Sequence, residues 1–253
     1  MADKLKFYLG YDESKNIRAI NAQSLLIGGK RGSGKSIFLN NFIYNLLLHN
    51  SRDILRVKFY TEKYGAYNLT FNNERKSLPL IEFVNDPDLK KDNDFIDDAY
   101  YIYESRENTI RLAGVPDIHE YNKLNPSKAM QEVVYIVDGL INPIKIASPH
   151  SSRLATMLRE GARYGIYLVI VNSDEDKLNS MMIDEFPGKV VLACEESMSF
   201  MMLDSDLAST QAIAENRLAI YKDNVPHHSP IYFRTPLLTK EKMKLALDVF
   251  YQL

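Results

Sequence analysis

The sequence has 253 residues, of which 45% are hydrophobic and 25% are charged, and this length allows one α/β domain with a full-sized core. The formal net charge is -2, so the chain as a whole gives no electrostatic reason to bind nucleic acid or an anionic membrane. Its one cysteine, Cys194, cannot form an internal disulfide, and we expect a buried, unreactive thiol.

We expect neither a transmembrane helix nor a signal peptide in this sequence. No stretch is long and apolar enough to serve as a transmembrane helix, and residues 1–4 do not begin a signal peptide. We therefore expect a soluble chain that is not exported, although its parent protein can still be anchored in a membrane.

The first predicted elements surround a glycine-rich segment. Residues 7–20 are predicted to form a short hairpin with Gly10 and the polar residues after it as turn material. Residues 24–27 are predicted to be an apolar strand, and residues 37–48 a helix that is apolar on nearly every face. Such a helix packs beside a central sheet. Residues 54–60 are a further predicted strand.

An acidic, polar region occupies residues 72–98. It lacks the glycine and the closing glutamate of a calcium loop, so we expect a solvated, acidic helix start. Residues 95–112 are predicted to be helical, and Tyr100, Tyr101 and Tyr103 are expected to pack rather than to stack on bases. The clustered aspartates are Asp86, Asp88, Asp92, Asp94, Asp97 and Asp98.

Strands and helices alternate through the second half. Residues 132–138 are a continuous apolar run that ends on Asp138, which is typical of a buried strand. A predicted helix at 151–164 is followed by strands at 166–171 and 190–194. This alternation predicts a mostly parallel sheet that is covered on both faces.

The C-terminal part does not continue the alternation of buried strands and helices. Residues 217–222 and 231–234 are predicted to be edge strands, and residues 239–250 a terminal helix. His227 and His228 lie between the two strands. Adjacent strand residues face opposite ways, so we expect surface histidines rather than a metal site.

The glycine-rich segment matches the phosphate-loop pattern G-x-x-x-x-G-K-S. A loop of this kind turns consecutive backbone N–H groups toward a triphosphate, with the positive end of the following helix behind them. Glycines permit the close approach, the lysine reaches the β- and γ-phosphates, and the final hydroxyl ligates Mg²⁺. The sequence thus predicts a site for ATP and Mg²⁺ made by Gly29, Lys30, Arg31, Gly32, Ser33, Gly34, Lys35 and Ser36.

Two later strand ends complete the candidate site. Asp138 lies where a nucleoside triphosphatase holds the water shell of its metal, so Ser36 and Asp138 are the predicted magnesium residues. The next residue is Gly139, where hydrolytic members of the class usually have a glutamate. Loss of a general base typically costs about two to four orders of magnitude in rate, which predicts slow or absent hydrolysis. Asn172 and Ser173 are either a sensor of the γ-phosphate or a capped strand end.

Several segments together resemble the FtsK/SpoIIIE branch of the additional-strand P-loop ATPases. The resemblance covers roughly residues 7 to 222 and implies a RecA/FtsK-like three-layer α/β sandwich with a mostly parallel central sheet. The segments are residues 7–12 for the lead-in hairpin, 25–36 for the phosphate loop, 55–63, 133–138 for the acid strand, 162–172, 186–191 and 199–204.

The sequence departs from that family at motif positions. Thr61-Glu62-Lys63 stands for Asp-Pro-Lys, Gly139 for the glutamate, Asn172-Ser173 for Thr-Gln, and Phe200 for a motif arginine. Such losses resemble the last ATPase domain of the type VII secretion coupling ATPases of the EssC/EccC kind. The resemblance implies adjacent ATPase domains in the parent chain and WXG-type secreted substrates as partners. It also implies a cytoplasmic domain of a membrane-anchored protein, and allows a homo-oligomer of the full-length protein.

Three functions stay open at this point. The first is a weakly hydrolytic module of a secretion ATPase that recognises exported substrates. The second is an active motor for DNA or protein that needs residues from a neighbouring subunit. The third is a relic scaffold, by which we mean a domain that keeps the glycine loop but works without binding nucleotide. The resemblance also suggests a pocket for an apolar helix, but helical spacing favours a core face for the methionines that would line it: Met181, Met182, Met198, Met201 and Met202.

We expect residues 1–253 to form one domain of this family. Its predicted parts are the lead-in hairpin at 7–20, the nucleotide-binding core at 24–222, and a C-terminal edge strand and helix at 223–253.

Overall fold

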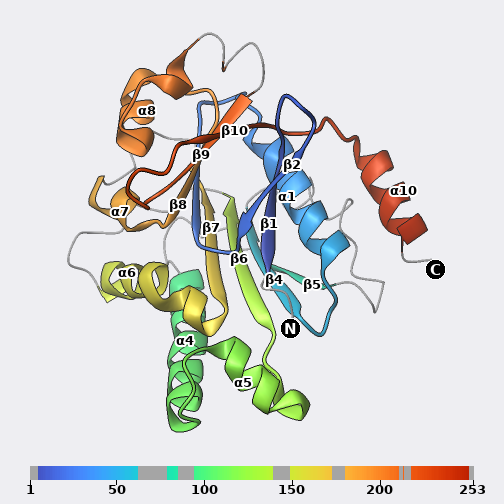
Figure 1. The fold of residues 1–253 in the computed structure, drawn as a ribbon, viewed down its shortest axis with the longest axis vertical. Coiled ribbons are helices and arrows are strands. Elements are labelled where there is room, and N and C mark those ends of the chain that lie inside the picture. Colours follow the sequence, from blue (N-terminus) through green and yellow to red (C-terminus); the bar gives the residue numbers. More distant parts are fainter. Residues whose placement is uncertain are drawn as a thin grey trace.

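The computed structural model describes residues 5–61, 79–84, 94–138, 149–172, 180–210, 213 and 218–250. In these residues one sheet runs through the molecule and helices cover both of its faces (Figure 1). Its strands are β1 (Lys6–Tyr11), β2 (Ile17–Asn21), β3 (Leu25–Gly28), β4 (Leu55–Thr61), β5 (Leu80–Val84), β6 (Glu132–Asp138), β7 (Ile166–Val171), β8 (Gly188–Val191), β9 (Leu218–Asp223) and β10 (Ile231–Arg234).

The strand order is β2-β1-β10-β9-β8-β3-β7-β6-β4-β5. The strands from β8 to β5 pair in parallel, and the remaining pairings are antiparallel. The structure therefore confirms the expected α/β sandwich with a mostly parallel central sheet. One strand, β7, separates the glycine-loop strand β3 from the acid strand β6.

The helices form two layers. They are α1 (Lys35–His49), α4 (Asp94–Leu112), α5 (Ile118–Leu124), α6 (Pro149–Glu160), α7 (Ser180–Glu185), α8 (Glu196–Leu203) and α10 (Lys240–Phe250), with 3₁₀ turns η1 (Pro126–Lys128), η2 (Gly161–Tyr164) and η4 (Leu207–Ser209). Figure 1 shows α1 and α10 on one face of the sheet and α4, α6, α7 and α8 on the other.

The alternation of side chains along each strand builds a separate core under each layer. Leu25 and Ile27 of β3 face the core beneath α1, whereas Leu26 between them faces the opposite core. Aromatic packing joins the lead-in hairpin to the first core, where the Phe7 ring lies 4.9 Å from Phe42 and 5.7 Å from Tyr167, centroid to centroid. Both faces of the central strands are therefore buried.

Several predicted features are confirmed. The strands at 132–138, 166–171 and 231–234 have the predicted bounds. Cys194 is buried, and both His227 and His228 are exposed. None of the helices in the described ranges has the combined length and hydrophobicity that crossing a bilayer requires.

The prediction of edge strands near the C-terminus is wrong. Strand β10 pairs with β9 on one side and with β1 on the other, through Tyr11 and Arg234, so both β9 and β10 lie inside the sheet. The N-terminal hairpin covers them and leaves β2 at that edge. This pairing joins residues more than two hundred positions apart, and local periodicity carries no information about it.

The expected acidic helix start is confirmed, since α4 begins at Asp94 and Asp97 is exposed, but the packing expected of all three tyrosines is wrong for Tyr101. Tyr101 is 74% exposed rather than packed, while Tyr103 stacks on Tyr100 and meets the Tyr164 ring edge-on. Asp97 accepts hydrogen bonds from Arg153 and His150, and Asp98 accepts them from Lys58 and Tyr135. These two carboxylates tie α4 to α6 and to the sheet, whereas Asp86, Asp88, Asp92 and the Asp94 side chain lie outside the described residues.

Candidate functional site

The connection from β3 to α1 has the backbone shape of a phosphate-binding loop. Gly29, Gly32 and Gly34 have φ of 155°, 83° and 102°, values that L side chains rarely adopt. At Gly29 space adds to the restriction, because a Cβ there would lie 2.6 Å from the Ser33 hydroxyl and 3.1 Å from the Leu192 Cβ. The glycines of the motif are therefore required by the conformation of the loop.

Lys35 lies folded against this loop. The residue is only 8% exposed, and its ammonium donates hydrogen bonds to the carbonyls of Gly29 at 2.5 Å and Lys30 at 2.8 Å. The positive charge is thus held at the centre of the loop, next to the first turn of α1.

Two groups at the start of α1 fit an anionic ligand. Gly34 caps the helix in the left-handed conformation and provides no side-chain acceptor for the N–H groups of the first turn. The buried hydroxyl oxygen of Ser33 makes no hydrogen bond with the described residues. A phosphate at this helix end would accept hydrogen bonds from such donors and would meet the positive end of the helix dipole.

The loop is held from behind by the chain that follows β8. Leu192 donates its N–H to the Gly28 carbonyl, and Lys30 donates its N–H to the Ala193 carbonyl, both at 2.9 Å. Met198 and Met202 of α8 are buried and pack where a Cβ on Gly28 would lie. This places them in the core, as the spacing of these methionines favoured.

The polar strand ends lie along one edge of the sheet with the loop. The Asn172 N–H donates to the Ile27 carbonyl at 2.8 Å. Asn172 therefore lies beside the end of β3, directly before the glycine loop. Asp138 is 4% exposed and is one strand further, in register with Val171 of β7 and Thr61 of β4. Gly139, Ser173 and residues 62–63 lie outside the described residues.

This donor set fits a magnesium nucleotide. Backbone N–H groups, the Lys35 ammonium and the helix end suit phosphate oxygens, and the Ser36 hydroxyl and the Asp138 carboxylate are oxygen donors of the hard kind that would hold Mg²⁺. Bound Mg²⁺ would neutralise charge on the phosphates and polarise the bond to the terminal phosphorus.

A cavity of about 590 Å³ opens directly beside the loop. Sequence reasoning did not predict its apolar wall, because the wall combines α1, the segment after β8 and the connection from β10 to α10. The lining residues are Lys30, Arg31, Gly32, Ser33, Gly34, Ile37, Leu192, Ala193, Ile213, Leu218, Ala219, Thr235 and Leu237. Its size and its mostly apolar far wall suit the base and sugar of a nucleotide whose phosphates lie on the loop.

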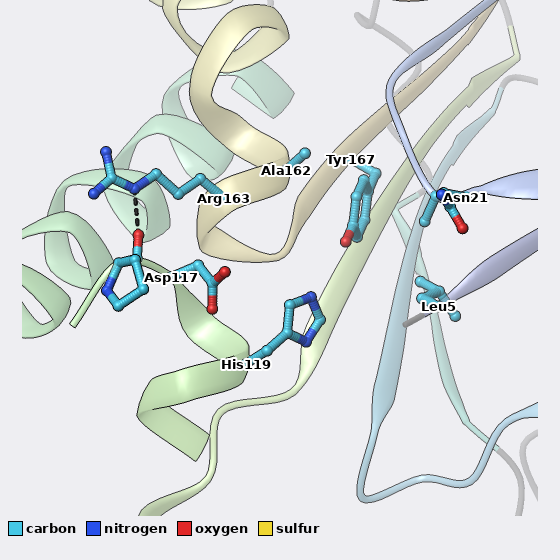
Figure 2. Close-up of a pocket in the computed structure, with 9 residues that line it drawn as sticks. Leu5, Asn21, Asp117, His119, Ala162, Arg163 and Tyr167 are labelled. Carbon is cyan, nitrogen blue, oxygen red and sulfur yellow. Dashed lines mark hydrogen bonds between the residues drawn. The ribbon is translucent and has the colours of Figure 1, made fainter. Parts of the chain in front are cut away.

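A second cavity, of about 440 Å³, lies at the opposite ends of the parallel strands. Figure 2 shows Asp117 and His119 directed into it from α5, facing Leu5 and Asn21 across the space, with the Tyr167 ring between the two sides. It has no glycine loop. Asp117 is engaged in capping α5, since its side chain accepts from the Glu120 N–H.

Beneath this second cavity lies a buried polar cluster. The Tyr167 hydroxyl donates to the Glu132 carboxylate at 2.5 Å, and the Arg106 guanidinium donates to the carbonyls of Tyr164, Gly165 and Gln131. Burial raises the pKa of Glu132, against the opposing effects of the Tyr167 hydrogen bond and of His119 and Arg106. Burial also lowers the pKa of Arg106 to about 10.

Known sequences resemble most of the chain. Residues 9–186 match the family model described as the FtsK/SpoIIIE family. The DNA translocase FtsK of Leptospira interrogans serogroup Icterohaemorrhagiae serovar copenhageni (strain Fiocruz L1-130) is 24% identical over 263 residues, which cover 96% of this chain and 26% of the translocase. The chain thus spans about a quarter of that relative's length.

Solved structures share the fold at lower sequence identity. The pCW3 conjugation coupling protein TcpA, in its monomer form with ATPγS, has a TM-score of 0.76 and 14% identity over all of this chain and 71% of TcpA. The cytoplasmic domain of the Thermomonospora curvata type VII secretion ATPase EccC has a TM-score of 0.71 and 16% identity, over 98% of this chain and 31% of EccC. These likenesses confirm the predicted fold.

Proposed function

Because the chain belongs to the FtsK/SpoIIIE family, we propose that it is an ATP-binding domain of a type VII secretion coupling ATPase and that it hydrolyses ATP slowly. The observation that carries the nucleotide site is the loop itself: three glycines with positive φ, the Lys35 ammonium folded onto the loop, and an α1 start without a side-chain cap. In this proposal the phosphates lie on residues 29–36.

Ser36 and Asp138 hold Mg²⁺ in the proposed site, and Asn172 senses the γ-phosphate from the end of β7. The water that attacks the terminal phosphorus needs a base to accept its proton, and Gly139, which follows Asp138, has no side chain to do so. The domain therefore binds nucleotide, weakly in the isolated state, and turns it over slowly.

The proposed partners are other ATPase domains of the same parent chain and exported helical proteins of the WXG type. The fold shared with EccC supports this class of parent, and the chain covers only 31% of that protein. We further propose that residues 1–253 are one domain, on the cytoplasmic side of a membrane-anchored protein.

A second candidate is an ATP-driven motor for DNA or protein. The similarity to DNA translocases named FtsK favours it. In that case the missing base and the arginine that Phe200 replaces would come from a neighbouring subunit.

Calorimetric titration with MgATP tests the nucleotide site. We expect saturable binding, and we expect Lys35→Ala to weaken it about tenfold to hundredfold, because a charge-assisted bond to phosphate is lost. Lys6→Ala, a lysine at the start of β1, is the matched control and should bind normally. Absence of binding to the native domain would leave the relic scaffold as the better explanation.

Steady-state ATP turnover separates the secretion module from the motor. We expect slow turnover by the native domain and an increase of about tenfold or more in Gly139→Glu, since a general base is typically worth about 10²–10⁴. Fast turnover by the native domain that disappears in Lys35→Ala would refute the slow-hydrolysis proposal. Salt-sensitive binding to duplex DNA would support the motor instead.

Partner recognition is tested by capture of purified WXG-type proteins on the immobilised domain. Retention of a protein that carries its C-terminal export signal, and loss of retention when the signal is deleted, is the expected pair of results. Equal retention with and without the signal would rule out signal recognition by this domain.

A further inference from the structure

A buried asparagine links the phosphate-loop helix to the far wall of the adjoining cavity. Asn41 lies on α1 and is 2% exposed. Its side-chain amide donates to the Ile37 carbonyl at 2.8 Å and to the Pro236 carbonyl at 2.9 Å. Pro236 is 195 positions away in the sequence. Asn45, one turn later, makes the matching intrahelical bond to the Asn41 carbonyl at 2.8 Å. The bond across to Pro236 is what distinguishes Asn41.

The orientation of this amide follows from its partners. Both groups that it faces are carbonyls, so only the NH₂ side can point at them. The Asn41 oxygen is buried and makes no hydrogen bond with the described part of the chain. The side-chain NH₂ group of Asn41 therefore makes two hydrogen bonds, while its side-chain oxygen makes none with the described residues.

Pro236 lies between two residues of the cavity wall. Its neighbours Thr235 and Leu237 both line the space beside the glycine loop. Leu237 is 58% exposed and Leu238 is 38% exposed, so the segment presents apolar side chains rather than burying them. Since proline has no N–H, this point of the segment can be tied to α1 only through its carbonyl.

The same segment is fixed at its two ends. Arg234, the last residue of β10, is in register with Leu218 of β9, which also lines the cavity. On the other side Thr239 accepts at its hydroxyl from the Lys242 N–H at the start of α10, and Met243 is buried in the core beneath α1. The Asn41 bond holds the middle of a short span that is anchored on both sides.

We propose that Asn41 is the positioning residue that sets the base-binding wall at a fixed distance from the phosphate loop, and so makes the site prefer a nucleotide over a bare polyphosphate. The proposal rests on the nucleotide site proposed above. Asn41 lies on the same continuous helix as Lys35 and Ser36, so a displacement of residues 235–237 would move the base contacts and leave the phosphate contacts in place.

The test compares two ligands on one set of variants. Binding of MgATP and of magnesium tripolyphosphate is measured by calorimetry, because tripolyphosphate fills the loop without touching the wall. In Asn41→Leu, which keeps the number and branching of the side-chain heavy atoms and favours helix, we expect MgATP affinity to fall about threefold to tenfold and tripolyphosphate affinity to stay within about twofold. Asn45→Leu is the matched control and should change neither.

Two further variants keep the test decisive. If Asn41→Leu does not fold, Asn41→Ser replaces it, because serine retains a bond to the Ile37 carbonyl but is too short for Pro236. Leu237→Ala, at an exposed position, removes part of the wall itself and should lower only MgATP affinity.

Each outcome has one meaning. Equal loss of both ligands in the Asn41 variant, or no loss of either, would overturn the positioning role. Equal affinity of the native domain for MgATP and tripolyphosphate would overturn the base wall and leave phosphate binding standing. If the native domain binds neither ligand, it is the proposed function that fails.

Discussion

The two ends of the parallel strands treat polar groups in opposite ways. At the amino ends, Arg106 donates to three carbonyls and Tyr167 donates to Glu132. At the carboxyl ends, Ser33 keeps a buried hydroxyl without a partner among the described residues, and α1 begins without a side-chain cap. Each end opens on a cavity. The comparison teaches that cavity size alone does not identify a site. Among the described residues that line the two cavities, the buried donor without a partner, the Ser33 hydroxyl, lies in the cavity at the carboxyl ends.

The largest expected effect is a loss of stability from a substitution at the amino ends of the strands. Arg106→Met should reduce the free energy of unfolding by about 3 to 5 kcal/mol, because it takes a donor from the carbonyls of Tyr164, Gly165 and Gln131 and removes a cation near Glu132. The Gly165 carbonyl keeps the Val133 N–H as its second donor. Urea unfolding measures this loss. Calorimetry at a temperature where the variant is folded should give native affinity for tripolyphosphate, and a large loss of affinity would show that the two ends are coupled.

A smaller effect at the same end isolates one hydrogen bond. Tyr167→Phe should cost about 1 to 3 kcal/mol of unfolding free energy near neutral pH, since the Glu132 carboxylate loses the donor that lies 2.5 Å away. Tyr232→Phe, at a tyrosine that is 41% exposed, is the matched control and should stay within about 0.5 kcal/mol. A loss no larger than that of the control would mean that water replaces the phenol.

The pH dependence of stability sharpens the same comparison. The pKa of Glu132 is raised above 4.5 in the folded state by burial, so the folded protein binds more protons at this group than the unfolded chain does. The contribution of Glu132 to stability must therefore fall as pH rises from 4.5 through its folded pKa.

Glu132→Gln removes this titration and keeps an acceptor for Tyr167. The stability difference between the variant and the native protein should move in favour of the variant as pH rises from about 5 to about 8, measured by urea unfolding at each pH. A difference that does not change with pH would contradict a raised pKa for Glu132.

The smallest expected effect on stability concerns the carboxyl end. Ser33→Ala deletes a buried hydroxyl that has no partner in the described residues, so the unfolding free energy without ligand should change by no more than about 0.5 kcal/mol. MgATP affinity should fall about threefold or more if the hydroxyl donates to phosphate. Destabilisation of the ligand-free protein beyond about 1 kcal/mol would show that the hydroxyl is satisfied in the free state.

The sequence predicts local parts of this molecule well. The acid strand is an apolar run with Glu132 and Asp138 at its two ends, and the strand at 166–171 is an apolar run between Gly165 and Asn172, so the sequence itself marks where each strand ends. The glycine loop is equally local, because one eight-residue pattern specifies its backbone and its ligand chemistry. Strand β5, in contrast, is only five residues long and lies inside residues 72–98, so the interpretation of that whole segment as a polar region is wrong at Leu80–Val84.

Features assembled from distant segments could not be read in the same way. The wall at Thr235 and Leu237 meets the loop only because β10 pairs inside the sheet, and Asn41 resembles any helical asparagine until Pro236 is placed beside it. The Tyr167 to Glu132 bond likewise depends on the register of β6 with β7. The slow hydrolysis expected from Gly139 stays a prediction, since this residue lies outside the described residues.

The position of β3 in the sheet has a consequence for how the chain folds as it is made. Strand β3 lies between β7 and β8, and the Lys30 N–H bonds to the Ala193 carbonyl. Strand β3 leaves the ribosome more than a hundred residues before its two neighbours, β7 and β8. Until then β3 has two open edges, so nascent chains that stop before β8 should need protection from aggregation and should not yet hold a phosphate.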